Sequence, residues 1–180
     1  MICLLNGGRE THKREGSYKL SRGVVVKDLL GTADFDKSLH NYDLKNIEPF
    51  TIISAHWNNG LRFIEVVWDG IKKHINELGL TSHIWSSSPL YDNNMKTLRD
   101  GWFRTFKEEK ELTPENLWEF HNSAGIGDKQ IDVVMDRGFV STQSITQIIN
   151  TSGETVMIYK DLQNKKITEK TFRNLPRFQN

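Results

Sequence analysis

The sequence predicts an α+β fold in which antiparallel sheets are covered by helices. Two apolar segments, residues 50–57 and 61–68, flank the Asn-Asn-Gly of residues 58–60. Asn and Gly tolerate the positive φ of a tight turn, so the two segments are typical of a β-hairpin. Residues 113–115 read Thr-Pro-Glu, which is a typical helix start. Further hairpin and helix patterns on both sides of these segments favour the same fold class.

The first part of the chain predicts a strand, a turn and two helices. Residues 2–5 are apolar and predict a buried strand, and the Asn-Gly-Gly of residues 6–8 predicts a turn. The polar residues 12–18 predict a loop. One apolar face indicates a helix over residues 22–30, and a shorter helix is predicted over residues 34–39.

The middle of the chain predicts a strand, a corner and a long helix. Residues 71–78 predict a third strand of the first sheet, and residues 83–85 predict another short strand. Three serines and a proline at residues 86–89 predict a change of direction. Apolar side chains then recur at helical spacing: Met95, Leu98, Trp102, Phe103 and Phe106.

The last third predicts a second hairpin. Residues 138–149 and 155–162 are expected to pair across residues 150–154. Residues 167–172 predict an added edge strand. The tail after Pro176 is expected to be untethered.

Composition limits the function classes. The length of 180 residues suits one domain, residues 1–180. The chain has 24 Lys and Arg against 23 Asp and Glu, a net charge of +1, so we expect neither a nucleic-acid partner nor an anionic membrane surface. The adjacent lysines 72–73 and 165–166 are typical of solvated surface. No apolar run approaches the ~20 residues that span a membrane.

The cysteine content predicts the compartment. Cys3 is the single cysteine, so no intrachain disulfide can form. This favours a reducing environment and therefore a cytoplasmic protein.

Four segments, in order, resemble a known family. They are residues 2–30 (ICLLNGGRETHKREGSYKLSRGVVVKDLL), 47–70 (IEPF…VVWDG), 83–103 (HIWSSSPLY…R..WF) and 141–146 (STQSIT). Together they are similar to the bacterial branch of the NRDE family, also called the transport-and-Golgi-organisation-2 family. The resemblance runs over nearly the whole chain and rests on the ordered set of segments. It implies an Ntn-hydrolase-like αββα sandwich, with two antiparallel sheets between layers of helices.

The chain departs from the family pattern at its start. Family members begin with Met-Cys and carry Asn-Arg-Asp-Glu shortly afterwards, and neither is present here. The chain therefore resembles the C-terminal two-thirds of the family pattern. On this interpretation the domain is N-terminally truncated and catalytically incomplete.

Two residues near the start are candidates for chemistry. An N-terminal nucleophile uses its own α-amino group as base, but Cys3 follows Met1 and Ile2 and lies in an apolar strand. We therefore expect Cys3 to be a buried structural residue with low reactivity. Asn6 follows the strand directly, and the resemblance to Ntn folds implies an amide that donates to an oxyanion. A plain turn asparagine is the alternative.

Five further residues are candidate ligand-binding residues: Ser87, Ser88, Tyr91, Arg99 and Ser144. The serines at the corner can line a cleft, or their hydroxyls can bond to backbone. No G-x-S-x-G context indicates a serine nucleophile. Tyr91 and Arg99 can bind the polar end of a ligand; alternatively, Arg99 pairs with Asp92 or Asp100.

The histidines predict no metal site, because the six are scattered without ligand spacing. The family has been linked to haem handling, and His83 or His12 would be the candidate haem ligands. No haem-attachment motif is present, so we expect no bound cofactor.

The preferred hypothesis is a catalytically incomplete domain that binds a small amphipathic ligand, either lipid-like or haem. One alternative is an amide-bond hydrolase whose N-terminal cysteine lies upstream of this chain. Another is a structural partner subunit. A truncated sheet would also expose an edge that favours a homodimer.

Overall fold

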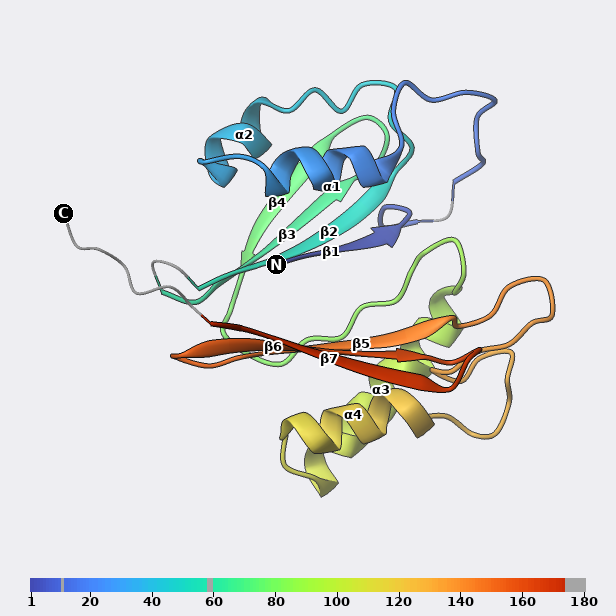
Figure 1. The fold of residues 1–180 in the computed structure, drawn as a ribbon. Coiled ribbons are helices and arrows are strands. Elements are labelled where there is room, and N and C mark those ends of the chain that lie inside the picture. The colour runs from blue at the N-terminus through green and yellow to red at the C-terminus, as the bar shows by residue number, and fades with distance from the viewer. Residues whose placement is uncertain (11, 58–59, 174–180) are drawn as a thin grey trace. The chain divides into compact units, whose positions relative to one another are not determined.

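The computed structural model describes residues 1–10, 12–57 and 60–173, and over these it has two antiparallel sheets and four helices (Figure 1). The predicted α+β class with antiparallel sheets is confirmed. The chain divides into two compact units, Met1–Lys96 and Thr97–Asn180. The boundary falls in the first turn of a helix, α3 (Asn93–Glu109).

The first unit is a four-stranded sheet with two helices. Its elements are β1 (Ile2–Asn6), α1 (Arg22–Leu30), α2 (Phe35–Asn41), β2 (Phe50–His56), β3 (Arg62–Trp68) and β4 (Lys73–Leu78). The strand order is β1-β2-β3-β4, and each neighbouring pair is antiparallel. The predicted hairpin of β2 and β3 is confirmed, with Phe50 opposite Trp68 and His56 opposite Arg62. Its predicted turn residues, Asn58 and Asn59, lie outside the described residues.

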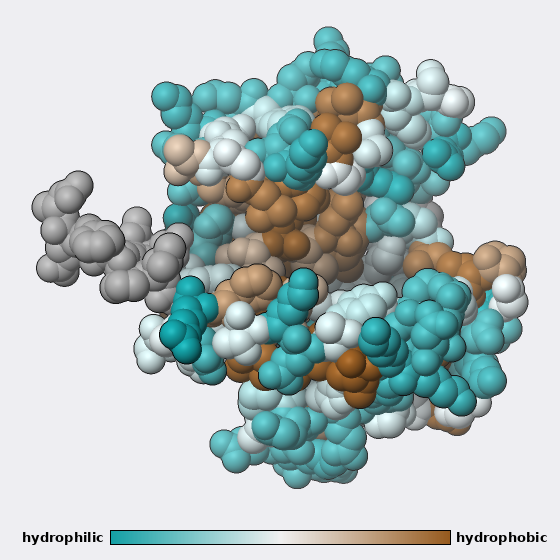
Figure 2. Space-filling model, in the orientation of Figure 1, coloured by the Kyte–Doolittle hydropathy of each residue, from teal (hydrophilic) through white to brown (hydrophobic). Residues whose placement is uncertain are grey.

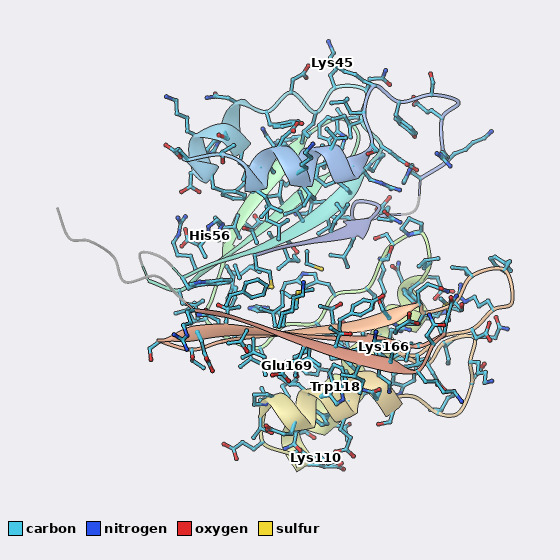
Figure 3. The ribbon with its side chains drawn as sticks, in the orientation of Figure 1. Lys45, His56, Lys110, Trp118, Lys166 and Glu169 are labelled. Carbon is cyan, nitrogen blue, oxygen red and sulfur yellow. The ribbon has the colours of Figure 1, made fainter. Side chains whose placement is uncertain are left out.

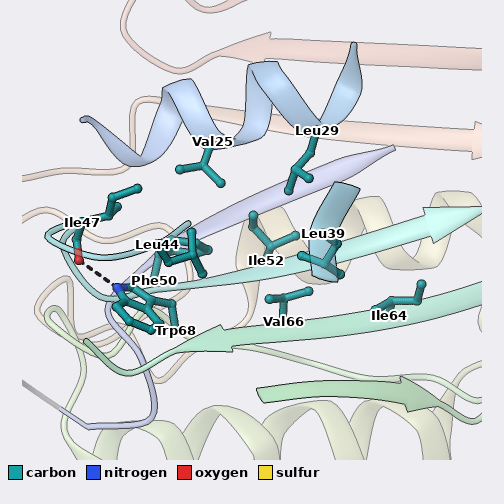
Figure 4. Close-up of a cluster of buried hydrophobic side chains, with 10 residues drawn as sticks. All are labelled: Val25, Leu29, Leu39, Leu44, Ile47, Phe50, Ile52, Ile64, Val66 and Trp68. Atoms are coloured by element: carbon teal, nitrogen blue, oxygen red, sulfur yellow. Dashed lines mark hydrogen bonds between the residues drawn. The ribbon is translucent and has the colours of Figure 1, made fainter. Parts of the chain in front are cut away.

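One face of the first sheet forms the main core together with α1 and α2 (Figure 4). On each strand every second residue points to this face. Ile52 on β2 and Val66 on β3 are examples, and both are fully buried. Val25 and Leu29 lie one helical turn apart on α1 and bury against them. The indole nitrogen of Trp68 donates a 2.8 Å hydrogen bond to the buried carbonyl of Ile47, which satisfies both polar groups.

The second unit is a three-stranded sheet with α3 and α4 (Pro114–Ser123). Its strands are β5 (Ser144–Asn150), β6 (Glu154–Asp161) and β7 (Lys166–Arg173), in that order and antiparallel. Thr113 caps α4, as predicted, because its hydroxyl accepts a hydrogen bond from the amide of Asn116. The amide of Gln147 on β5 donates to the carbonyl of Pro114, which ties α4 to the sheet. Trp118 lies on the side of α4 that faces the sheet (Figure 3).

Two predicted strands are corrected. Residues 83–85 form no strand, because the first sheet ends at β4 and their backbone pairs with none of its strands. The side chain of Trp85 bonds instead to Glu65, with 3.1 Å between Nε1 and Oε1. The strand predicted from residue 138 begins only at Ser144. The predicted untethered tail, after Pro176, lies outside the described residues.

Within the ranges that the structure describes, no helix combines the length and the apolar composition that crossing a membrane requires.

Candidate functional site

The structure brings Asn6, Ser87 and Ser88 together at the end of β1. The hydroxyl of Ser87 donates to the carbonyl of Asn6 at 2.9 Å, and the hydroxyl of Ser88 donates to the carbonyl of Gly8 at 2.5 Å. Lys96 Nζ donates to Ser88 Oγ at 3.0 Å. Ser88 is buried. The corner hydroxyls are therefore bonded to backbone, which is the structural alternative considered for these serines.

Close packing at this corner explains the glycine at position 7. Gly7 has a φ of +84°, and a Cβ built on it would lie 2.5 Å from Cδ of Pro89. Both facts exclude a side chain there without a shift of the backbone. The turn after β1 and the serine corner are thus held against each other by hydrogen bonds and by contact.

Asn6 is exposed, and its side-chain amide makes no hydrogen bond to any described residue. Its backbone carbonyl is the group that Ser87 binds. The amide therefore keeps its donors available for an outside acceptor, which is what an oxyanion donor requires. The geometry is compatible with the role that the resemblance implies for Asn6.

The prediction of a buried Cys3 is wrong, because this residue is exposed. Strand alternation puts it on the face of β1 opposite to Ile2 and Leu4, which pack against the core. Desolvation by neighbouring atoms nevertheless raises the pKa of the thiol. Cys3 is therefore mainly protonated at neutral pH and is a weak nucleophile.

The other three candidate residues divide between the two units. Tyr91 is buried in the first unit. Arg99 is buried in the second unit, and its Nη2 donates to two backbone carbonyls, those of Ile131 (3.1 Å) and Asp132 (2.6 Å). Ser144 begins β5 in the same unit. Arg99 therefore holds the segment around residues 131–132 against α3.

The histidines have local partners. His83 Nε2 lies 3.1 Å from the carbonyl of Gly79. His12 Nε2 lies 3.3 Å from Glu48 Oε1, and Arg22 forms a 3.2 Å ion pair with the other oxygen of Glu48. The buried Nδ1 of His12 has no hydrogen-bond partner among the described residues. Over the described part of the chain, no group of three or more His, Cys, Asp or Glu is arranged to hold a metal ion.

The second unit contains a pocket between α3 and α4 that the sequence analysis did not identify. It has a volume of about 260 Å³. It is lined by Trp102, Thr105, Phe106, Glu109, Lys110, Glu119, Phe120, Ser123, Ala124 and Gly125. Phe106 and Phe120 meet with ring centroids 5.0 Å apart, and Phe103 packs against Phe120 at 5.4 Å. The floor of the pocket is therefore aromatic.

The rim of the same pocket is charged. Lys110 Nζ forms a 2.8 Å ion pair with Glu119 Oε2, and both side chains are exposed. Figure 3 shows Lys110 on the side of the helices away from the sheet. Figure 2 shows hydrophilic residues over this helical part of the second unit. An apolar floor beneath a polar rim suits a ligand with an apolar body and a polar end.

The sequence signal for this pocket was incomplete. The spacing of Trp102, Phe103 and Phe106 predicted an apolar helix face, but not which rings would be buried. In the structure Phe103 is buried, whereas Trp102 and Phe106 are partly exposed and line the pocket. That division depends on how α4 packs on α3, which the spacing along one helix does not specify.

Comparisons of the chain with protein-family models, curated proteins and solved structures find no match. The resemblance to the NRDE family therefore stays a prediction from the sequence segments quoted above.

Proposed function

We propose that the chain is an NRDE-type, Ntn-hydrolase-like domain that binds a small amphipathic ligand. The αββα arrangement is part of this proposal. It is supported by two antiparallel sheets and by the two helices that each unit contributes. The observation that carries the binding function is the aromatic pocket with a charged rim between α3 and α4.

The pocket limits the class of ligand. Phe106 and Phe120 offer apolar surface, and Trp102 adds a large ring at the side. Aromatic side chains of this kind bind acyl chains and ring systems through apolar contact. The volume of about 260 Å³ lies at the small end of ligand sites. A short or medium acyl chain therefore fits better than a whole porphyrin, so a lipid-like ligand is favoured over haem.

The charged rim of the pocket indicates where the polar end of the ligand would bind. Lys110 is paired with Glu119, and both are well exposed, so the ion pair contributes little stability. A ligand carboxylate can replace Glu119 as the partner of Lys110 with little loss of protein stability. A medium-chain fatty acid would thus place its chain over Phe120 and its carboxylate near Lys110.

Titration of the purified protein tests the proposal. Medium-chain fatty acids, the matching fatty alcohols and haemin are added separately, and binding is followed by calorimetry. Thr105→Trp fills the mouth of the pocket and should reduce acyl affinity at least about tenfold, a loss that calorimetry resolves. Glu108→Trp changes an exposed residue of the same helix that does not line the pocket, and should leave affinity unchanged.

The polar end is tested separately. Lys110→Gln should weaken binding of the fatty acid but not of the fatty alcohol, because only the carboxylate of the acid pairs with the positive charge of Lys110. Saturable binding that Thr105→Trp does not affect would show that the ligand binds at another site. Failure of all three ligand classes to bind would reject the proposal.

A second candidate is an amide-bond hydrolase whose N-terminal cysteine lies upstream of this chain. The unbonded side-chain amide of Asn6 favours it, because an oxyanion donor needs free N–H groups. The genomic DNA before the Met1 codon is the direct check. If an in-frame Met-Cys is present, the extended protein should hydrolyse acyl amides, and Asn6→Ala should lower kcat far more than KM changes.

A further inference from the structure

The open edge of β1 has backbone groups that pair with no strand of the first sheet. Met1 and Ala55 exchange both backbone hydrogen bonds, at 2.9 and 3.0 Å, and the amide of Gly7 donates to the carbonyl of Pro49. In an antiparallel pair the bonded side alternates along the strand. The backbone groups of Ile2, Leu4 and Asn6 therefore point away from β2, toward the outer side of the sheet.

The two edges of the first sheet differ in charge. β4, at the far edge, carries Lys73, His74 and Glu77. β1 reads ICLLN and has no charged residue and no proline. Natural edge strands usually carry charges, prolines or bulges that prevent pairing with another chain. β1 has none of these protections.

One end of this edge is already occupied. The carbonyl of Asn6 accepts the hydrogen bond from Ser87 Oγ at 2.9 Å. No such partner is bonded to the outward backbone groups of Ile2 and Leu4 within the described part of the chain. The available length of the edge is therefore the segment centred on Cys3.

We propose that β1 pairs antiparallel with β1 of a second copy of this chain, with Ile2 of each copy bonded to Leu4 of the other and the two Cys3 residues opposite. The backbone groups that point outward belong only to even-numbered residues. The two-fold axis that relates the two copies therefore passes through Cys3 or through Leu4. An axis through Leu4 would need the carbonyl of Asn6, which Ser87 holds. The axis through Cys3 uses only Ile2 and Leu4.

A second copy fits this edge for two reasons. No side chain of β1 carries a charge that would repel a second β1, and an isologous two-fold pairing covers both edges at once. The paired segment is short, and interfaces below about 1,200 Å² are typical of weak complexes. The dimer is therefore expected to depend on protein concentration.

Hydrogen exchange of the full chain tests the pairing directly. Between low and high protein concentration, protection of the Ile2 and Leu4 amides should rise, together with a shift of the solution mass from one chain to two. A single chain at every concentration would overturn the proposal. So would a dimer whose newly protected amides lie in β5, the uncharged edge strand of the second sheet.

Variants at the exposed Cys3 test the register. Cys3→Lys sets two like charges opposite each other and should weaken the dimer about tenfold or more. Cys3→Ser keeps a small side chain and should leave the dimer intact. Thr168→Lys adds the same charge on the exposed strand β7 and should also leave it intact. A dimer that survives Cys3→Lys would contradict the pairing.

Cross-linking gives an independent measurement on the unmodified chain. Opposite residues of a non-hydrogen-bonded pair have Cα atoms about 4.5 Å apart, which is within disulfide range. Diamide, as the added oxidant, takes up the two thiol hydrogens and should yield a disulfide-linked dimer. With the axis through Leu4, the two Cys3 residues would be diagonal neighbours about 7–8 Å apart, and little cross-linking would form. Absence of the linked dimer at high concentration would overturn the register.

Discussion

Ser54 Oγ lies 2.5 Å from Nε2 of His56, two residues along the same face of β2. Ser54 is fully buried, and the His56 ring also packs on Phe35 with centroids 4.5 Å apart. This pair lies at the end of β2, where Figure 3 shows His56. A buried hydroxyl thus depends on an imidazole that can titrate.

The first prediction concerns the pH dependence of folding. Burial, followed by the positive Met1 amino group, lowers the pKa of His56 below its ordinary 6.5, although Asp36 opposes this. The folded state therefore holds the proton less tightly than the unfolded state. The contribution of His56 to stability is present above pH 6.5 and is lost as the pH falls toward the lowered pKa. Urea midpoints measured between pH 7.5 and pH 5 should fall accordingly.

The control for this prediction separates His56 from other histidines. His56→Gln should flatten part of the pH dependence. His121 should supply another part, because burial and the charge of Arg99 lower its pKa as well. His40→Gln, on the surface of α2, should leave the full slope. An unchanged slope in His56→Gln would contradict the assignment.

The second prediction concerns the contact between the turn after β1 and the serine corner. Gly7→Ala should reduce the free energy of unfolding by at least about 2 kcal/mol, since it adds both a disfavoured φ and a collision with Pro89. Gly60 has a similar φ of +94°, but nothing lies within 4 Å of the position that a Cβ would take there. Gly60→Ala should cost only about 1 kcal/mol. Equal losses in the two variants would mean that the collision is relieved.

The sequence was sufficient where structure is set locally. The hairpin of β2 and β3 was predictable because two apolar segments lie close together in the sequence, on either side of Asn-Asn-Gly. The sequence was insufficient to predict contacts between residues that lie far apart in the chain. Lys73 was expected on a solvated surface together with Lys72, yet it is half-buried and bonded to carbonyls more than 30 residues earlier. Lys72 precedes β4 and Lys73 begins it, but only the position of α2 gives Lys73 its role.

The candidate site shows the same limit. Asn6, Ser87 and Ser88 were each candidates from the sequence, but their meeting at the end of β1 depends on hydrogen bonds between residues about 80 positions apart. The role of Arg99 was not predictable, since its carbonyl partners at Ile131 and Asp132 lie more than 30 residues away in an irregular segment. Long polar side chains reach partners that no periodicity encodes.

The third prediction concerns Arg99. Its guanidinium donates through Nε and Nη2 to the carbonyl of Ile131 and through Nη2 to the carbonyl of Asp132. Arg99→Lys keeps the charge but cannot reproduce this fork, so it should cost about 2–3 kcal/mol. Arg104→Lys changes an exposed arginine of the same helix and should stay within about 0.5 kcal/mol. Urea unfolding followed by circular dichroism gives both values, and equal values would exclude the carbonyl bonds as the cause.

The fourth prediction concerns the C-terminal end of α2. Lys73 Nζ donates to the carbonyls of Leu39, of His40 at 2.9 Å and of Tyr42 at 3.2 Å. These carbonyls lie at or just beyond the end of the helix, where a cation is favoured by the helix dipole. Burial lowers the pKa of Lys73, so part of the gain is offset by desolvation.

Lys73→Met keeps the aliphatic stem and removes the donors, so it should cost about 1–3 kcal/mol and leave those carbonyls without a partner. Hydrogen exchange should then be fastest in the α2 amides, because the loss begins at that helix end. Lys72→Met is the matched control, since the neighbouring lysine is exposed, and it should change neither value. Faster exchange spread evenly over the first unit would show that Lys73 acts through the sheet rather than through α2.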